Sequence, residues 1–340
     1  MNDDLRQRLG NLGGLGVALL VWTIYAVYFS PTQGWVFFFQ LSVNGIILGS
    51  VYALIALGYS MVYGILKLLN FAHGDVYMIG AFIGFGVLTL LGGPLNPAIP
   101  VALLVLCMFV VAMLGSGFLG LAIERFAYRP LRDAPRIAPL ISALGVAFFL
   151  ENSALLLFGA QFRNYDGFDL ISYNGIHLGG DNGVFIQYLG VIVIVGAFLL
   201  MLALLALVHW TRLGKAMRAV SFDREAAAMM GIDIDRVIVF AFVLGSALAG
   251  AAGVFYALRV PTQVSIGFVA GLKGFTAAVI GGIGSVPGSM AGGLILGLAE
   301  SYTQGYWDTR WSDLVVFSIL IAFMILRPQG LFGRADIRKV

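Results

Sequence analysis

Few side chains in this 340-residue sequence could do chemistry, and five of them lie inside or between long apolar runs. Glu151 and Asn152 fall within one apolar run, whereas Asn70, His73 and Asp75 fall in a polar turn between two others. An ionisable group in hydrocarbon is costly and usually functional, so these five residues are candidates for contact with a polar solute. The alternative is structural: Glu151 would fix helix packing, and the turn residues would satisfy free backbone groups at helix ends.

Metal and enzyme chemistry are not predicted. The sequence has three His residues, none spaced four residues from another His or Cys, and it has no His-Glu-x-x-His or G-x-S-G motif. No phosphate-binding loop is present either, because Gly214-Lys215 has His209 in place of the first Gly and Ala216 in place of Ser or Thr. We therefore expect no cofactor on this chain, and any ATP would be hydrolysed by another subunit.

A polar segment late in the sequence predicts a short helix within residues 221–231. Ser221 or Asp223 can cap its start, Asp223 and Glu225 suit the positive end of the helix dipole, and Gly231 suits its C-terminal turn. A helix of two turns is unstable in water unless it packs against something. The segment is therefore interpreted as a docking helix for another protein, and the alternative is a simple connecting turn.

The elements that must position these residues are membrane spans. Sixty per cent of the residues are hydrophobic and 11% are charged, whereas soluble domains average about 25% charged residues. A bilayer core needs about 20 apolar residues per helix, which predicts an all-α, polytopic transmembrane bundle in contact with lipid. The net charge of +3 does not indicate nucleic-acid binding. The charge-free runs are 15–66, 76–123, 183–208, 237–258 and 274–299.

Lys and Arg gather at the N-terminus, at 124–136, at 209–236 and in the C-terminal tail. The positive-inside rule places these four segments in the cytoplasm, with both termini, and the 160–182 loop outside. We expect eight to ten membrane segments. The predicted spans are 15–30, 35–57, 76–92, 98–121, 138–159, 187–208, 237–258, a region from 265 to 303 broken within 281–293, and 312–326.

The broken region is expected to form two short or re-entrant segments, which membranes tolerate only where protein or a water-filled cavity covers the backbone. Small residues spaced by four, in this region and in earlier ones, predict close helix contacts in the bundle. These pairs are Gly45/Gly49, Gly80/Gly84, Gly267/Gly271, Gly288/Gly292 and Gly293/Gly297.

Several blocks resemble a known family. Glu225-Ala226-Ala227, followed after three residues by Gly231, resembles the EAA loop with which ABC importer permeases dock onto their ATPase. The blocks Asn44–Asp75, Glu124–Arg132, Ala278–Glu300 and Arg327–Gly333 look like branched-chain amino acid permeases of the LivH type. The resemblance covers about residues 36–333 of what we interpret as one permease domain, 1–340, to which 15–34 adds an extra span.

What the resemblance implies is a bacterial inner-membrane importer for leucine, isoleucine and valine. A second related permease, two ATPases that bind ATP and Mg²⁺, and a periplasmic amino-acid-binding protein would complete it. Related permeases carry urea, short amides or other substrates, and a stand-alone secondary transporter is a further alternative. The implied ATPase-coupling residues are Asp223, Arg224, Glu225, Ala226, Ala227 and Gly231.

Overall fold

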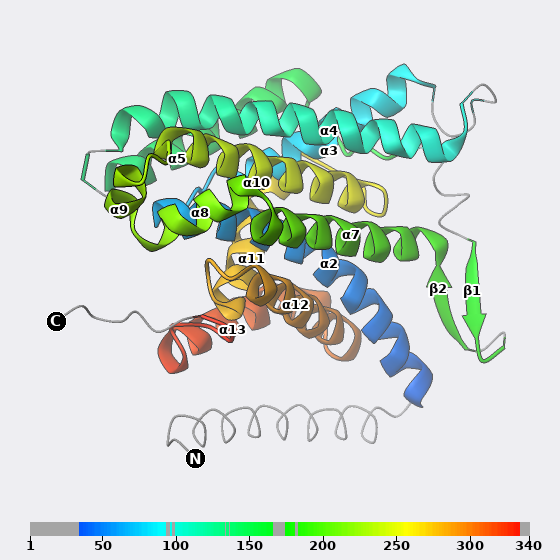
Figure 1. Ribbon diagram of the computed structural model, residues 1–340. Coiled ribbons are helices and arrows are strands. Elements are labelled where there is room, and N and C mark those ends of the chain that lie inside the picture. The colour runs from blue at the N-terminus through cyan, green and yellow to red at the C-terminus, as the bar shows by residue number, and fades with distance from the viewer. Residues whose placement is uncertain are drawn as a thin grey trace, which may run out of the picture.

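The computed structural model describes residues 34–333, apart from 93–95, 97–98, 133, 136, 166–173 and 181–182. This part of the chain forms eleven α-helices, three short turns of π- or 3₁₀-helix and one two-stranded hairpin (Figure 1). Seven of the α-helices are long and apolar enough to cross a membrane, which confirms the predicted all-α membrane fold. The predicted span at 15–34, apart from its last residue, and the cationic residues near both termini lie outside the described residues.

Helix α2, Gly34–Leu66, lies at the centre of the bundle (Figure 1). It is apolar on all sides, as is typical of a helix that is surrounded by other protein or by lipid. In its most apolar window 89% of the residues are buried, against 72% in α10, Ile234–Ala257, and 67% in α3, His73–Leu90. These three helices therefore form the inner part of the bundle, together with α11, Ile266–Gly281, and α12, Val286–Tyr306.

Four other helices form the outer part of the bundle and bury less than a third of their apolar windows. They present large apolar side chains outward, as lipid-facing or subunit-facing helices do. Helix α4 continues through the π-helical turn η1, Glu124–Tyr128, and the 3₁₀ turn η2, Arg129–Leu131. The outer helices are α4, Val101–Ile123, α5, Ile137–Phe158, α7, Tyr188–Trp210, and α13, Ser312–Leu326, which follows the 3₁₀ turn η3, Thr309–Trp311.

The predicted glycine pairs lie at helix–helix contacts. Gly45 and Gly49 of α2 face Gly293 and Gly297 of α12, where a Cβ atom on Gly297 would lie 2.3 Å from the Gly49 backbone. The other pairs lie where α3 meets α10, where α11 meets α3 and where α12 meets α11. Packing through small residues, as predicted for helices in lipid, is therefore confirmed.

The predicted break in the late region is present, but it is shorter than expected. The chain turns only at 282–285, where Gly282 and Gly284 have φ of +100° and +92°, and Ser285 then caps α12. Residues 286–293, predicted to lie in the break, are helical, so α12 has 21 residues and is not a short segment. Pro287 lies in the first turn of α12. A backbone N–H at that position would have no partner within the helix, so Pro, which has no N–H, is tolerated there.

The C-terminal block from Arg327 to Gly333 covers this turn. The amides of Leu331 and Phe332 donate hydrogen bonds to the carbonyls of Ile280 and Gly281, at 2.8 and 3.0 Å. The last carbonyls of a helix lack partners within it, so the block satisfies groups that α11 leaves free. The resemblance found at 327–333 therefore marks a backbone cap.

The connecting segments gather at two ends of the bundle. At one end are the helices α8, Arg212–Phe222, and α9, Arg224–Met229 (Figure 1). At the other end lies the hairpin of β1, Gly175–Leu178, and β2, Val184–Gln187, which pairs Gly175 with Gln187. The side chain of Gln40 exchanges hydrogen bonds with the backbone of Phe185 in β2, which fixes the hairpin to the start of α2.

Several predicted helix boundaries differ from those in the structure, and two of them lie close to the candidate polar residues. Helix α2 continues nine residues beyond the predicted end at 57, because residues 58–66 contain no Pro and their glycines permit close packing. Helix α3 begins at His73 rather than at 76, so His73 and Asp75 belong to its first turn and only Asn70 lies in the preceding turn. Buried neighbours that exclude water let these polar residues continue the helix.

Candidate functional site

The short helix predicted within 221–231 is present as α9. Asp223 caps its start, because the carboxylate Oδ1 accepts hydrogen bonds from the amides of Glu225 and Ala226, at 3.0 and 3.1 Å. Ser221 instead donates to the carbonyl of Arg218 in the last turn of α8. Gly231 has a φ of +80°, the left-handed conformation expected of a helix C-terminus.

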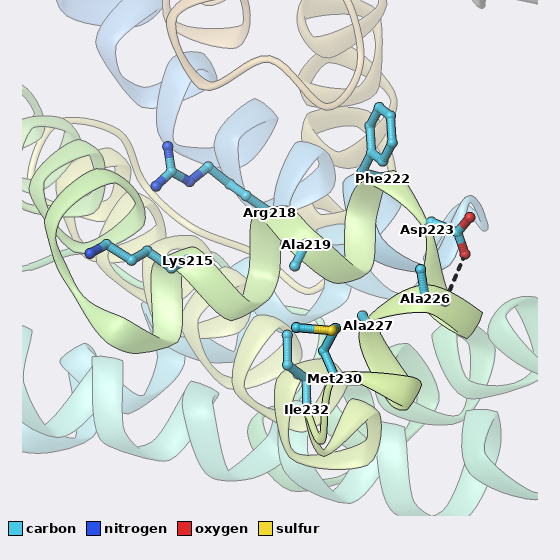
Figure 2. A pocket seen from close by; sticks show the side chains of 9 residues that line it. All are labelled: Lys215, Arg218, Ala219, Phe222, Asp223, Ala226, Ala227, Met230 and Ile232. Carbon is cyan, nitrogen blue, oxygen red and sulfur yellow. Dashed lines mark hydrogen bonds between the residues drawn. The ribbon is translucent and has the colours of Figure 1, made fainter.

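A groove of about 470 Å³ lies between α8 and α9 (Figure 2). Lys215 and Arg218 extend from α8, while Met230 and Ile232 lie beside Ala227 at the end of α9 (Figure 2). Phe222 also lines the groove and is 87% exposed, and Met229 and Met230 are each 82% exposed. An exposed patch that combines apolar and cationic side chains is typical of a surface that binds another protein.

Ala227, one of the implied coupling residues, differs from its neighbours in exposure. Its side chain is buried in this chain, whereas Glu225, Ala226 and Gly231 are exposed. The reason is the geometry of α9, since a helix of six residues turns one side toward the bundle and Ala227 lies on that side. The outward face of α9 is therefore made by Glu225, Ala226 and the two Met residues.

Arg224 joins α9 to the central helix. Its Nη2 and Nε donate to the carbonyl of Ile65 at 2.5 and 3.2 Å, one residue before α2 ends. Burial and the nearby charge of Arg132 lower the pKa of Arg224. The guanidinium carries the positive charge that a helix C-terminus favours.

A cluster of charged residues at the same end was not predicted as a unit. Asp235, at the start of α10, pairs with Arg129 at 2.6 Å and with Arg132, and Arg132 also pairs with the fully buried Glu124. The cluster ties the end of α4 to α10. The block Glu124–Arg132 contains three of the four residues, but its partner Asp235 lies more than one hundred residues later.

The predicted pathway residues do not all come together. Asn70, His73 and Asp75 are buried, the ring of His73 lies 4.7 Å from that of Tyr59, and the hydroxyl of Tyr128 donates to Asn70. Glu151, half-buried on α5, lies close enough to Asp75 for the two carboxylates to interact electrostatically. Asn152 is exposed, and its side-chain amide donates a hydrogen bond to the carbonyl of Phe148 in its own helix.

A second polar cluster, largely buried, joins four helices and was not predicted as a unit. Lys273 of α11 contacts Glu300 of α12 and Asp313 of α13, at 2.7 and 2.8 Å. The hydroxyl of Tyr52 in α2 donates to Glu300 at 2.8 Å. Buried charges are stable only when they are paired and hydrogen-bonded, so this cluster specifies how the four helices pack.

In the described part of the chain, no three His, Cys, Asp or Glu residues are grouped so that they could hold a metal ion. The arrangement combines three features: an exposed surface on α8 and α9, a hydrogen-bonded contact from α9 to the central helix α2, and buried polar residues in the segment that follows α2. These features suit the transmission of movement.

Comparison with known proteins gives one consistent result. The family described as branched-chain amino acid transport system, permease component, matches residues 41–324. The permease BraD of Pseudomonas aeruginosa is 41% identical over 89% of this chain and 98% of its own length. The permease LivH of Escherichia coli K12 is 42% identical over 91% of this chain and all of its own length. LivM of the same organism is 26% identical over 83% of this chain and 67% of its own. No solved structure matches.

Proposed function

This chain belongs to the family of permease components of branched-chain amino acid transport systems, and we propose that it is one of two permease subunits of an ATP-driven importer of leucine, isoleucine and valine. It is a multi-pass membrane protein and a transport subunit, not itself an enzyme. We place it in the bacterial inner membrane, with the α8–α9 end in the cytoplasm, because Lys and Arg are enriched there.

The proposed importer has three further kinds of subunit. A second permease related to this one completes the membrane pathway, and the similarity to LivM supports this part of the proposal. Two ATPase subunits bind ATP and Mg²⁺, since this chain has no phosphate-binding loop. A periplasmic amino-acid-binding protein delivers the substrate to the hairpin end.

The observation that carries the proposal is the surface made by α8 and α9. It combines a capped, outward-facing helix with an adjacent groove whose rim carries Lys215 and Arg218. We propose that this surface binds an ATPase subunit, with Glu225, Ala226 and Met229 in contact and Gly231 fixing the angle at which α9 ends. A stand-alone transporter would have no use for such a surface.

We place the substrate route beside Asp75 and Glu151, near Asn70 and His73 at the start of α3. A free amino acid carries an ammonium group, and a carboxylate is its natural partner. Neither Asp75 nor Glu151 has an ion pair in the described part of the chain, so the two carboxylates are available to a cationic group. The apolar side chains of the substrates need no charged contact.

The test is ATP-driven uptake by the reconstituted importer. Gly231→Val forces a residue with a Cβ into a left-handed conformation, at a cost of roughly 1–2 kcal/mol, and Glu225→Lys reverses a charge on the outward face. Both variants should lose uptake and retain less ATPase in a detergent pull-down, while the bundle stays inserted. Glu151→Gln is the control, since it should reduce uptake but leave ATPase retention unchanged.

Normal uptake by both the Gly231 and Glu225 variants would show that α9 only connects its neighbouring helices, and it would remove the main support for the proposal. Substrate assignment needs a separate measurement. Leucine, isoleucine and valine should compete with one another for uptake, and urea should not. Uptake of urea that leucine leaves untouched would assign the protein to another branch of the superfamily.

A further inference from the structure

The contact between α9 and the rest of the bundle depends largely on one residue. Of the six residues of α9, only Ala227 is buried, and Arg224 is the one whose side chain donates hydrogen bonds to a distant helix, at the carbonyl of Ile65. That carbonyl belongs to the last turn of α2, where backbone oxygens have no partner within the helix. The fork of the guanidinium gives this oxygen two donors and fixes the direction from which α9 approaches.

Residues 67–72 form a short joint between α2 and α3. Lys67, directly after α2, has a φ of +57°, which residues with a Cβ rarely adopt. Two residues later, the carbonyl of Leu69 accepts a hydrogen bond from the hydroxyl of Tyr128, which also contacts Asn70. Tyr128 therefore holds residues 67–72 near their middle, and Arg224 holds the last turn of the helix that precedes them.

The joint leads directly to the buried polar residues. Helix α3 begins at His73, and Asp75 lies in its first turn against Gly267 of α11. A displacement of the end of α2 therefore changes the position of the start of α3, because only six residues separate the two helices and these are anchored.

We propose that Arg224 is the positioning residue that transmits movement of α9 to the end of α2, and through residues 67–72 to the start of α3. The proposal rests on the function proposed above, in which an ATPase moves α9. Arg224 does not serve as an anchor for the ATPase itself, since its guanidinium is turned toward Ile65. Its loss should uncouple ATP hydrolysis from transport without releasing the ATPase.

The experiment compares Arg224→Ala and Arg224→Lys in the complete importer, reconstituted in liposomes with its binding protein. Three quantities are measured: the ATPase retained in a pull-down, the rate of ATP hydrolysis, and the uptake per ATP hydrolysed. Arg224→Ala should retain the ATPase and hydrolyse ATP, with uptake per ATP reduced about tenfold, as the loss of a charge-assisted hydrogen bond implies. Arg224→Lys should have an uptake per ATP between those of Arg224→Ala and the wild type, because the ammonium group makes a single contact where the guanidinium makes two.

Arg236→Ala is the matched control. Arg236 lies at the same end and is exposed, and it forms an ion pair with Asp233 three residues before it. The variant therefore loses the same charge without changing a contact to α2. It should keep wild-type uptake per ATP. Normal uptake per ATP in Arg224→Ala would overturn the proposal, and so would loss of the ATPase from that variant.

If Arg224→Ala fails to fold, the proposal is tested with Arg224→Lys alone. Wild-type uptake per ATP in Arg224→Lys would then overturn the proposal. Failure of the proposed function has a different signature, because the wild-type chain itself would then retain no ATPase.

Discussion

Replacing Gly297 by Ala should separate the two helices at the centre of the bundle. A Cβ atom at this position would lie 2.3 Å from both the Cα and the N of Gly49, and 2.5 Å from the carbonyl oxygen of Gly45. Ordinary van der Waals contact begins at 3.4 Å, and the obstructing atoms are backbone atoms that cannot rotate away. Helices α2 and α12 must therefore move apart by about 1.1 Å at this point.

The cost of this separation has two parts. Overpacking of a close contact costs about 1–3 kcal/mol. The same shift would stretch the hydrogen bond from Tyr52 to Glu300, now 2.8 Å and one turn from Gly297, beyond hydrogen-bonding distance. A bond to a charged group contributes about 1.5–3 kcal/mol, so we expect a total loss of about 2.5–6 kcal/mol. That is a large fraction of the 5–15 kcal/mol by which proteins are typically stable.

The assay is thermal unfolding of the purified protein in detergent, with uptake by the reconstituted complex as the second measurement. Gly86→Ala is the control, because Gly86 lies inside α3 and an added Cβ there has no atom within 4 Å. It should be neutral or slightly stabilising, since Ala favours helix over Gly. Equal unfolding temperatures for Gly297→Ala, Gly86→Ala and wild type would refute the reasoning.

Three further changes test other parts of the structure by their effect on unfolding. Lys67→Gly should stabilise the protein by about 1 kcal/mol, because Gly adopts a positive φ without strain, and a lower unfolding temperature would contradict this. Tyr52→Phe removes a buried donor to Glu300 and should cost about 1.5–3 kcal/mol, whereas Tyr188→Phe, at an exposed position, should cost almost nothing. Asp235→Asn weakens two partly exposed ion pairs and should cost about 1 kcal/mol at low salt, with the difference from wild type shrinking at high salt. A salt-independent difference would show that the pairs with Arg129 and Arg132 do not stabilise the protein.

The membrane spans could be predicted from the sequence because the thickness of the bilayer fixes their length and composition. The glycine pairs could be predicted for a related reason, since only small residues permit backbones to approach closely in lipid. The end of α2 could not be predicted in this way. Residues 58–66 contain Tyr and Ser among the apolar residues, and whether such a stretch stays helical depends on the neighbours that bury it.

Contacts between distant residues were beyond the reach of the sequence alone. Arg224 and Ile65 are 159 residues apart, and a guanidinium can bind any free carbonyl, so nothing in the sequence selects this one. The pairing of Lys273 with Glu300 could not be predicted for the same reason, because the sequence does not select which charged residues pair. The orientation of Ala227 depended on which side of α9 meets the bundle, and a run of three alanines gives no indication of that side.

The packing of α2 against α12 has a consequence for how the chain is made. Helix α2 ends at Leu66, but its glycine-lined partner is completed only at Tyr306. Ribosomes add about 5–20 residues per second, so α2 spends roughly 10–50 s in the membrane before its partner has been synthesised. During that interval the face that carries Gly45 and Gly49 is open to lipid or to any insertion factor that covers it. Assembly of the central helix pair is therefore one of the last events in biogenesis, and a chain arrested before α12 would expose the surface on which quality control can act.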